Sequence, residues 1–448
     1  MNGLRADTRL AWQLLRGAGR REWWRIALTA AGAALATGLA QAAVTLLLLR
    51  GSYGIPHAHG LLDQPGTRAG IVVGLLLSFV PVLGFLGQCA RVGAVHRDRR
   101  LAGLRLAGAA LWQVRRIAAL ETGIACLLGS VVMTCCAAVA VLLTWSAPTG
   151  AAWAGLALVA VAVPVAGAGA GALALRRVVA SPLGRVRRVA PRSGRTYPAA
   201  LLVVTVTALL VVTATGGGTG GRVRWQGPAV VCALVLAAGV GAVWLSGTVS
   251  RLTGRLLAAR ARTAATLIAA ERLRADPWAA ARTHAALLLV TVTGTAFLCV
   301  RHALLAGLAA ADRPVADPAY YTAGLELTGA ALLVALFLAL SALAVAGAES
   351  LGARRRTLAA QVASGVPRAV LNRALLLETA LPLAPALPTA GAGGLAAGAW
   401  YSALTGAGSL PWTALLIAPA VYASCLLASA ATLPLLNRAV RPGELRYA

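Results

Sequence analysis

Two stretches of the sequence share one spacing of arginine, glycine and glutamate residues. The first stretch, 99–121, starts with arginine, has Gly108 near its middle and ends on Glu121. The second stretch, 356–378, repeats the pattern around Gly365, and twelve residues separate the glycine from the glutamate in both. An arginine guanidinium pairs with carboxylate or phosphate groups through a planar fork of N–H donors. The pattern therefore supports ion pairing and recognition, not the making or breaking of covalent bonds.

A basic segment of this kind between two apolar runs has two interpretations. It is either an amphipathic loop held by anionic lipid head groups or a surface on which a partner docks. A shift of 257 positions superimposes the two stretches, and this duplicated spacing favours docking. Thr357 stands where the first stretch has Arg100, so we expect the second surface to be weaker than the first.

We expect each stretch to form two helices that meet at the glycine and lie along the inner membrane surface. Gly108 suits a bend or a helix C-terminus, because glycine adopts the left-handed conformation needed there. Glu121 and Glu378 then lie where a membrane span begins, a place where a carboxylate is costly unless it is paired or at the interface. We expect each glutamate to occupy the first turn of its helix, where negative charge suits the helix dipole, rather than to relay protons.

The composition predicts the elements that carry these stretches. Apolar residues make up 59% of the 448 positions and charged residues only 12%, about half the charged share of a soluble domain. Several uncharged runs reach about 20 residues, the length that crosses a hydrocarbon layer of about 30 Å. The sequence therefore predicts an all-α polytopic membrane protein.

Ten spans are expected, and the distribution of arginine predicts their orientation. The expected spans are about 26–49, 69–90, 122–145, 152–175, 198–214, 229–246, 284–304, 326–347, 379–402 and 412–436. All 41 basic residues are arginine, and 35 of them fall in segments that this arrangement puts on the cytoplasmic side. Positive charge inside is the rule for bacterial cytoplasmic membranes, so we expect both termini in the cytoplasm. The orientation of the spans, with arginine on the cytoplasmic side, accounts for the net charge of +28. Because the charge is explained in this way, no nucleic-acid partner is expected.

The repeat divides the chain into two halves and a connection. A first half (1–197) carries an amphipathic segment and spans 1–4, a two-helix hairpin (198–250) carries spans 5–6, and a second half (251–448) carries spans 7–10. Matching spans run in the same direction, which predicts a pseudo-two-fold axis along the membrane normal. Two equivalent cytoplasmic surfaces suit a symmetric dimeric partner.

Several features of the sequence resemble the signature of FtsX-like permeases. They are the motif Arg-x-Leu-Ala-x5-Gly-x12-Glu before a span, its second copy, and the segments "ERLRADPWAAART" and "RPGELR". Such permeases are the transmembrane subunits of ABC transporters of the MacB and LolCDE type, and the resemblance is to ten-span members. Many relatives carry a large extracytoplasmic domain. Here the corresponding loops are short, about 50–68 and 305–325, so we expect a substrate that reaches the spans from the bilayer.

The resemblance implies a partner and the residues that couple to it. Permeases of this family associate with a separate ATPase of the MacB/LolD type, here expected as a cytoplasmic homodimer, through the element between the second and third spans of each repeat. The implied coupling residues are Arg99, Arg100, Leu101, Gly108 and Glu121 in the first copy, and Arg356, Leu358, Gly365 and Glu378 in the second.

No site for catalysis, a metal or a cofactor is expected in this chain. A Walker A motif needs a lysine, and the sequence has none, so any ATP would be used by the partner subunit. His57 and His59 lack a neighbouring carboxylate or cysteine ligand and are interpreted as part of a solvated loop. Ionisable residues are nearly absent from the span centres, which disfavours a proton-coupled secondary transporter.

The sequence thus predicts a permease subunit of an ABC transporter, an exporter of an amphiphilic or lipophilic substrate in contact with membrane lipids. The alternative is an ATP-independent regulatory or scaffolding membrane protein that binds a cytoplasmic partner through the same surfaces.

Overall fold

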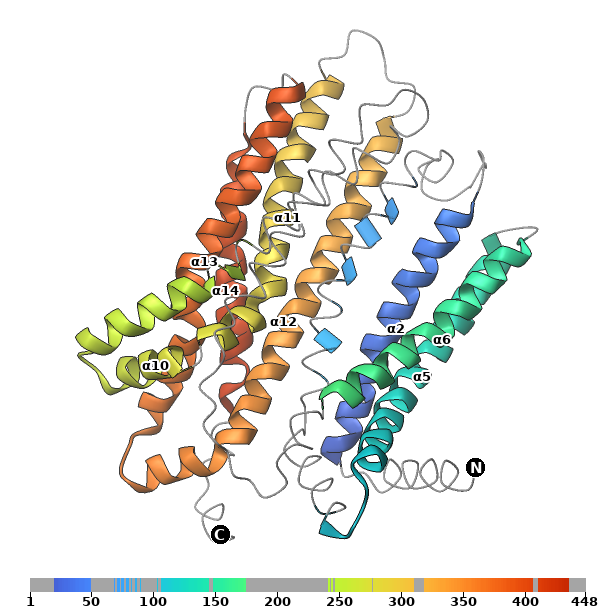
Figure 1. Ribbon diagram of the computed structural model, residues 1–448. Coiled ribbons are helices and arrows are strands. Elements are labelled where there is room, and N and C mark those ends of the chain that lie inside the picture. Colours follow the sequence, from blue (N-terminus) through green and yellow to red (C-terminus); the bar gives the residue numbers. More distant parts are fainter. Residues whose placement is uncertain are drawn as a thin grey trace. The chain divides into compact units, whose positions relative to one another are not determined.

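The computed structural model describes residues 20–49, 106–144, 148–174, 246–275, 277–309, 318–405 and 410–434, together with scattered single positions at 68–103 and 241–244. Every regular element in these ranges is a helix (Figure 1). Seven of the described helices are long and apolar enough to cross a membrane: Ile26–Leu48, Leu111–Thr144, Gly150–Ala172, Thr283–Ala309, Tyr321–Gly352, Arg368–Ala403 and Trp412–Ala430. The predicted all-α membrane protein is confirmed. The expected spans 69–90, 198–214 and 229–246 lie wholly or mostly outside the described residues.

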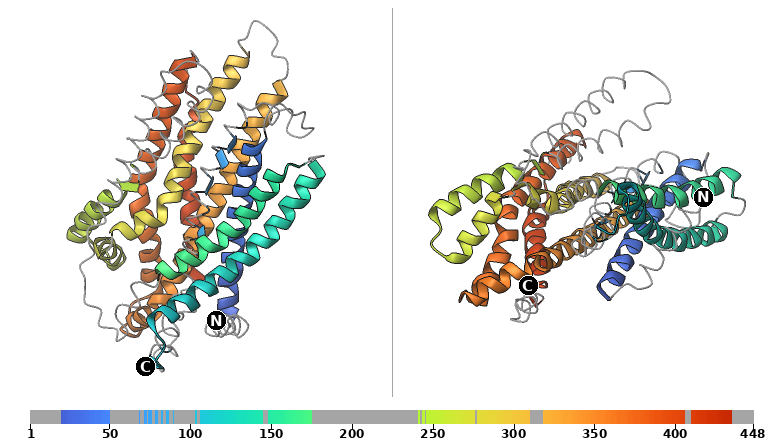
Figure 2. Two further views of the ribbon diagram at one scale, coloured as in Figure 1. Left: turned by 45° about the vertical axis from the view of Figure 1, so that its right-hand side comes forward. Right: turned by 60° about the horizontal axis from the view of Figure 1, so that its bottom comes forward.

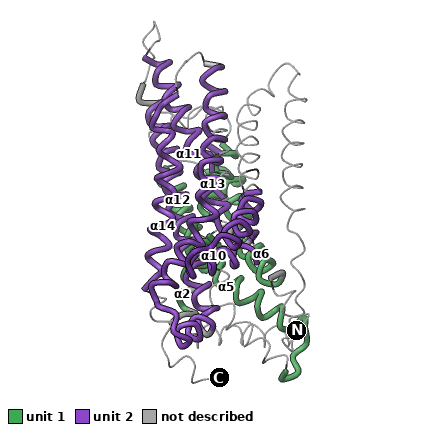
Figure 3. Tube along the Cα trace, turned by 90° about the vertical axis from the view of Figure 1, so that its left-hand side faces the viewer, with its two compact units in different colours: residues 1–50, 85–190 green, residues 51–84, 191–448 purple. Residues whose placement is uncertain are grey.

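Residues 1–50 and 85–190 form one compact unit, unit 1 (Figure 3). Its described helices are α2 (Arg20–Leu48), α5 (Leu111–Thr144) and α6 (Gly150–Ala174), and each packs against the other two. The backbones of α2 and α5 approach so closely that a Cβ atom on Gly129 would collide with the carbonyl oxygen of Ala30. Small residues allow this contact, which is the usual way that helices associate inside a bilayer.

A buried glutamine also joins the three helices of unit 1. The side-chain amide of Gln41 in α2 donates to Thr134 Oγ1 of α5 at 2.8 Å and to the Leu156 carbonyl of α6 at 3.2 Å. Ser130 donates to the Ala160 carbonyl at 2.9 Å, so α5 and α6 share a second polar contact. Interhelical hydrogen bonds of this kind strengthen packing where no water competes.

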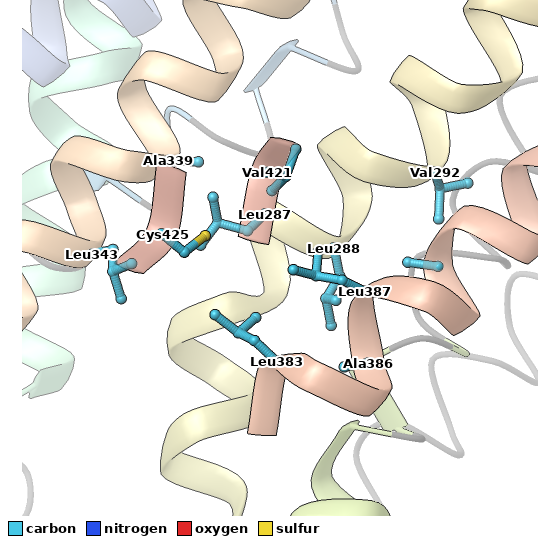
Figure 4. Packing of buried hydrophobic residues seen from close by; sticks show 11 residues of the cluster. Leu287, Leu288, Val292, Ala339, Leu343, Leu383, Ala386, Leu387, Val421 and Cys425 are labelled. Carbon is cyan, nitrogen blue, oxygen red and sulfur yellow. The ribbon is translucent and has the colours of Figure 1, made fainter. Parts of the chain in front are cut away.

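Residues 51–84 and 191–448 form the second compact unit, unit 2. Its described elements are α10 (Ala264–Ala275), α11 (Pro277–Ala309), α12 (Pro318–Ala363), α13 (Arg368–Thr405), the short 3-10 helix η3 (Trp412–Leu416) and α14 (Ile417–Ala430). A core of buried side chains joins the four helices α11, α12, α13 and α14. Leu287, Leu383 and Val421 are among its members (Figure 4).

Several helices extend well beyond the spans expected from the sequence. Helix α12 has 46 residues, about 69 Å of helix, and continues for eleven residues beyond its apolar portion, which ends at Gly352. Helices α5 and α13 each begin eleven residues before the start expected for their spans, because the second helix of each motif continues into the span without a break. Helix α13 also continues through Pro382, Pro385 and Pro388.

Helix starts recur at a constant separation in the chain. Helix α2 begins at Arg20 and α11 at Pro277, while α5 begins at Leu111 and α13 at Arg368. Both separations equal 257 positions, the same shift that superimposes the two sequence motifs.

Candidate functional site: two helical elbows

The glycine of the second motif ends a helix through a specific turn. Gly365 is the second residue after the end of α12 and has a φ angle of 94°. The N–H of Val366 donates to the Gln361 carbonyl and the N–H of Gly365 to the Val362 carbonyl, both at 3.0 Å. This bond pair is the Schellman motif, in which glycine is favoured because a side chain opposes the left-handed conformation. We call residues 353–378, on either side of this turn, the second elbow.

The first motif forms a matching turn, and residues 106–121 are here the first elbow. Gly108 also has a φ angle of 94°. Three backbone hydrogen bonds hold this turn. The N–H of Ala107 donates to the Gly103 carbonyl, and the N–H groups of Gln113 and Val114 donate to the Ala110 carbonyl. The same bonds recur 257 positions later. The N–H of Ser364 donates to the Ala360 carbonyl, and the N–H groups of Val370 and Leu371 donate to the Pro367 carbonyl. The predicted bends are therefore confirmed at both glycines, and the two turns share their local geometry.

An apolar cluster holds the second elbow together from inside. Leu351 and Leu358 of α12 are buried against Leu371 of α13, and neighbouring valines and a leucine pack around them. Leu358 is only 1% exposed, so it lies inside the elbow and not on its surface. In the first elbow, Val114 is buried at the position that matches Leu371. Packing of this kind makes each elbow a stiff unit.

Glu378 joins three helices at the base of the second elbow. Arg272 of α10 donates from Nη1 to Glu378 Oε1, and Arg354 of α12 donates from Nη1 to Glu378 Oε2 at 3.2 Å. The Glu378 side chain is only 19% exposed. Because Glu378 is the eleventh residue of α13, the expected first-turn role at the helix dipole is wrong for this residue. Its observed role is to receive two arginines.

The two arginines remain charged at neutral pH in spite of their surroundings. Burial, and then the positive charge of Arg354, lower the pKa of Arg272 to about 10. Burial also lowers the pKa of Arg354. The main cause of the lowered pKa of Arg272 is the loss of water around its guanidinium, since burial disfavours the charged form.

Glu121 occupies the matching place in the first elbow. It is the eleventh residue of α5 and is buried, so the first-turn role is wrong here too. One turn earlier, the guanidinium of Arg116 lies 4.5 Å from the centre of the Trp112 ring, a cation–π contact.

The helix that follows each glutamate is long enough to cross a membrane. From Glu121 to Thr144 the helix rises about 35 Å, and from Glu378 to Ala403 about 38 Å. Either length crosses a hydrocarbon layer of about 30 Å with a modest tilt.

The two elbow tips differ in surface chemistry. The first tip exposes Leu106, Leu111 and Trp112, which are large apolar side chains. The second tip exposes Ser364 and Arg368, with small residues around them. The two tips therefore expose different side chains, and the weaker second surface expected from Thr357 stays a prediction.

Not every residue predicted for the coupling surface falls in the described part of the chain. Arg99, Arg100 and Leu101 lie outside it. Arg356 lies in α12, but its side chain is among those not described.

Sequence reasoning missed the two partners of Glu378. Arg354 carries a signal that could have revealed it, because Arg97 stands 257 positions earlier and the motif comparison began only at Arg99. Arg272 lies within the quoted segment "ERLRADPWAAART", but nothing in that segment indicates which carboxylate it meets.

Among the described residues, no group of three or more histidine, cysteine or acidic side chains could hold a metal ion. His57 and His59 lie outside those residues. Comparison of the chain with protein-family models, with curated proteins and with solved structures finds no match.

Proposed function

We propose that this protein is an FtsX-like permease, the transmembrane subunit of an ABC transporter that a separate cytoplasmic ATPase drives. The observation that carries the proposal is the pair of elbows. Each has the same left-handed glycine turn, and each is followed by a long apolar helix with a glutamate at its eleventh position. Two similar protruding turns offer two docking points to a two-fold symmetric ATPase.

The proposed architecture is the ten-span arrangement of two parallel repeats joined by a hairpin. Helices α2 and α5 correspond to α11 and α13 in this scheme, because their starts lie 257 positions apart. Both termini and both elbows face the cytoplasm in a bacterial cytoplasmic membrane, in accord with the distribution of arginine.

The stiffness of the elbows suits the transmission of movement. ATP binding and hydrolysis would move the ATPase against the elbow tips, and packed helices transmit such displacements as discrete shifts. In the second elbow the motion passes directly to α12 and α13, and through Glu378 to α10. The substrate is an amphiphilic or lipophilic molecule that enters from the bilayer and is exported.

Co-expression with the ABC ATPase encoded by a neighbouring gene tests this proposal. We expect the two proteins to co-purify and to hydrolyse ATP. Charge reversal of Arg99 and Arg100 to glutamate should weaken assembly by about tenfold or more, since opposite charges would become like charges across the interface. The matched control reverses Arg222 and Arg224, which the expected topology puts on the other side of the membrane, and should leave assembly unchanged.

Unchanged assembly and ATPase activity after reversal of Arg99 and Arg100 would show that these residues do not dock the partner. Recovery of a soluble partner that is not an ATPase would favour the alternative, a regulatory or scaffolding membrane protein.

A further inference from the structure

A helical hairpin precedes α11, which is the first candidate span among the described residues of unit 2. Residues 246–260 form one helix, residues 261–263 the turn, and α10 the second helix; together, residues 246–275 are here the basic hairpin. Thr263 caps α10, because the Thr266 N–H donates to its hydroxyl at 3.3 Å. The basic hairpin lies across the direction of α11 and α13 instead of along it (Figures 1 and 2).

One face of the basic hairpin packs against the protein. A Cβ atom on Gly247 would meet the Trp278 ring of α11 at 2.5 Å, so the hairpin backbone lies directly on that ring. Within the hairpin, a Cβ atom on Gly254 would lie 3.2 Å from the Ala270 carbonyl oxygen. Ala269 and Leu273 of α10 are buried.

The outer face of the basic hairpin combines exposed leucines with exposed arginines. Leu252, Leu256 and Leu267 are each about half exposed or more. The exposed arginines of this face are Arg251, Arg255, Arg260, Arg262 and Arg274. A helical segment that exposes both leucine and arginine, and lies across the spans, is typical of elements that rest in the interface of an anionic membrane.

A second positive feature lies at the base of the basic hairpin. Arg272 and Arg354 share the single carboxylate of Glu378, which leaves one positive charge in excess. Each guanidinium donates to Glu378 from Nη1, and within the described part of the chain its other N–H groups remain available to a further ligand. The side chains of Arg272 and Arg354 are 23% and 44% exposed, so a ligand can reach them.

We propose that Arg272 and Arg354 bind the phosphate group of an anionic phospholipid in the leaflet on which the basic hairpin lies. A phosphate oxygen can accept from the free edge of either guanidinium while Glu378 holds the opposite edge, since arginine presents five donors in a fixed fork. In the proposed topology Glu378 stands where the span begins, which brings a lipid head group to the same depth as the two arginines.

The chemistry of the surroundings favours a lipid over a free phosphate compound. The exposed leucines offer apolar surface to acyl chains, which a soluble phosphate does not have. Arginine-lined pockets beside membrane helices are also suited to lipid head groups. This inference does not depend on the ATPase partner, because it concerns only the protein and its membrane.

Native mass spectrometry of the detergent-purified full chain, titrated with dioleoyl phosphatidylglycerol, tests the site. Arg354→Gln is expected to weaken lipid binding about fivefold, the effect of one basic residue at a membrane surface. The matched control is Arg274→Gln on the same hairpin, which Glu271 already neutralises at 2.9 Å, and it should change binding less than twofold. Equal losses in the two variants, or no loss in Arg354→Gln, would overturn the proposal in favour of diffuse attraction.

Thermal unfolding of the unmutated protein gives an answer that no folding defect can obscure. Phosphatidylglycerol should raise the unfolding midpoint, whereas phosphatidylcholine and inorganic phosphate at equal concentration should not. An equal rise with inorganic phosphate would assign the site to a soluble phosphate compound, and no difference between the two lipids would exclude the site altogether.

Discussion

At the scale of single residues, the acidic side chain of Glu378 is placed to hold the base of the second elbow. Its carboxylate receives Arg272 and Arg354 from two other helices and is mostly shielded from solvent. Hydrogen bonds between charged groups in such a place contribute more than exposed ion pairs do. Glu378 thus stabilises the relative positions of α10, α12 and α13 within unit 2.

Replacement of Glu378 by glutamine tests this role. Loss of the charge leaves two arginines close together without a counter-ion, and we expect unfolding to become easier by about 1.5 to 3 kcal/mol. Glu271→Gln is the control, because its pair with Arg274 is exposed and should contribute no more than about 1 kcal/mol. Thermal unfolding in detergent measures both, and equal effects in the two variants would contradict the role given to Glu378.

The glycine bends could be predicted from the sequence, but the partners of Glu378 could not. A left-handed turn depends on one residue and its neighbours, so the repeated glycine was sufficient to indicate it. The bond between Arg272 and Glu378 spans 106 positions, and only tertiary packing brings these side chains together. In a chain with 41 arginines, charge alone does not select which ones meet a given carboxylate.

At the scale of elements, the Schellman turn fixes the angle at which α12 meets α13. Gly365→Ala places a Cβ atom where nothing lies within 4 Å, so any loss of stability arises from the left-handed φ angle alone. We expect a loss of about 1 to 2 kcal/mol. Gly352→Ala is the matched control in the same helix, also with open space around it, and should stabilise the protein by about 0.5 to 1 kcal/mol. Unfolding midpoints that shift in the same direction would refute this account of the turn.

Close contact between α11 and α13 depends on a second glycine. A Cβ atom on Gly394 would lie 2.5 Å from the Val292 carbonyl oxygen, whereas Gly393 beside it has nothing within 4 Å. Gly394→Ala should therefore cost about 1 to 3 kcal/mol through overpacking. Gly393→Ala at nearly the same depth should be neutral or slightly stabilising, and similar midpoints for the two variants would argue against tight packing here.

Helix type was predictable along the described spans, but helix length was not. A hydropathy pattern detects the apolar part of a helix. The sequence predicted that part for α5, α12 and α13. The extension of α12 carries arginines such as Arg354, so a hydropathy pattern does not detect it. In α12 and α13 the cluster around Leu358 and Leu371 stabilises the extensions instead.

At the scale of the whole molecule, the number of spans decides where the ends of the chain lie. Ten spans put both termini on the cytoplasmic side, while an odd number would put them on opposite sides. We expect green fluorescent protein fused to the C-terminus to fluoresce, and alkaline phosphatase inserted at 148–149, between α5 and α6, to be active. Activity of alkaline phosphatase at the C-terminus would contradict the ten-span topology.

The central claim is that both elbow tips contact an ATPase, and site-specific photo-crosslinking tests it most directly. Ala107 and Ser364 are exposed, one at each tip, and stand 257 positions apart in the chain. A photoreactive amino acid at either position, in cells that also express the neighbouring ATPase, should crosslink to that ATPase. The same amino acid at Ala259, which is exposed on the basic hairpin, should not. Adducts from both tips are the predicted result, and an assembled complex that gives none from either tip would contradict the account.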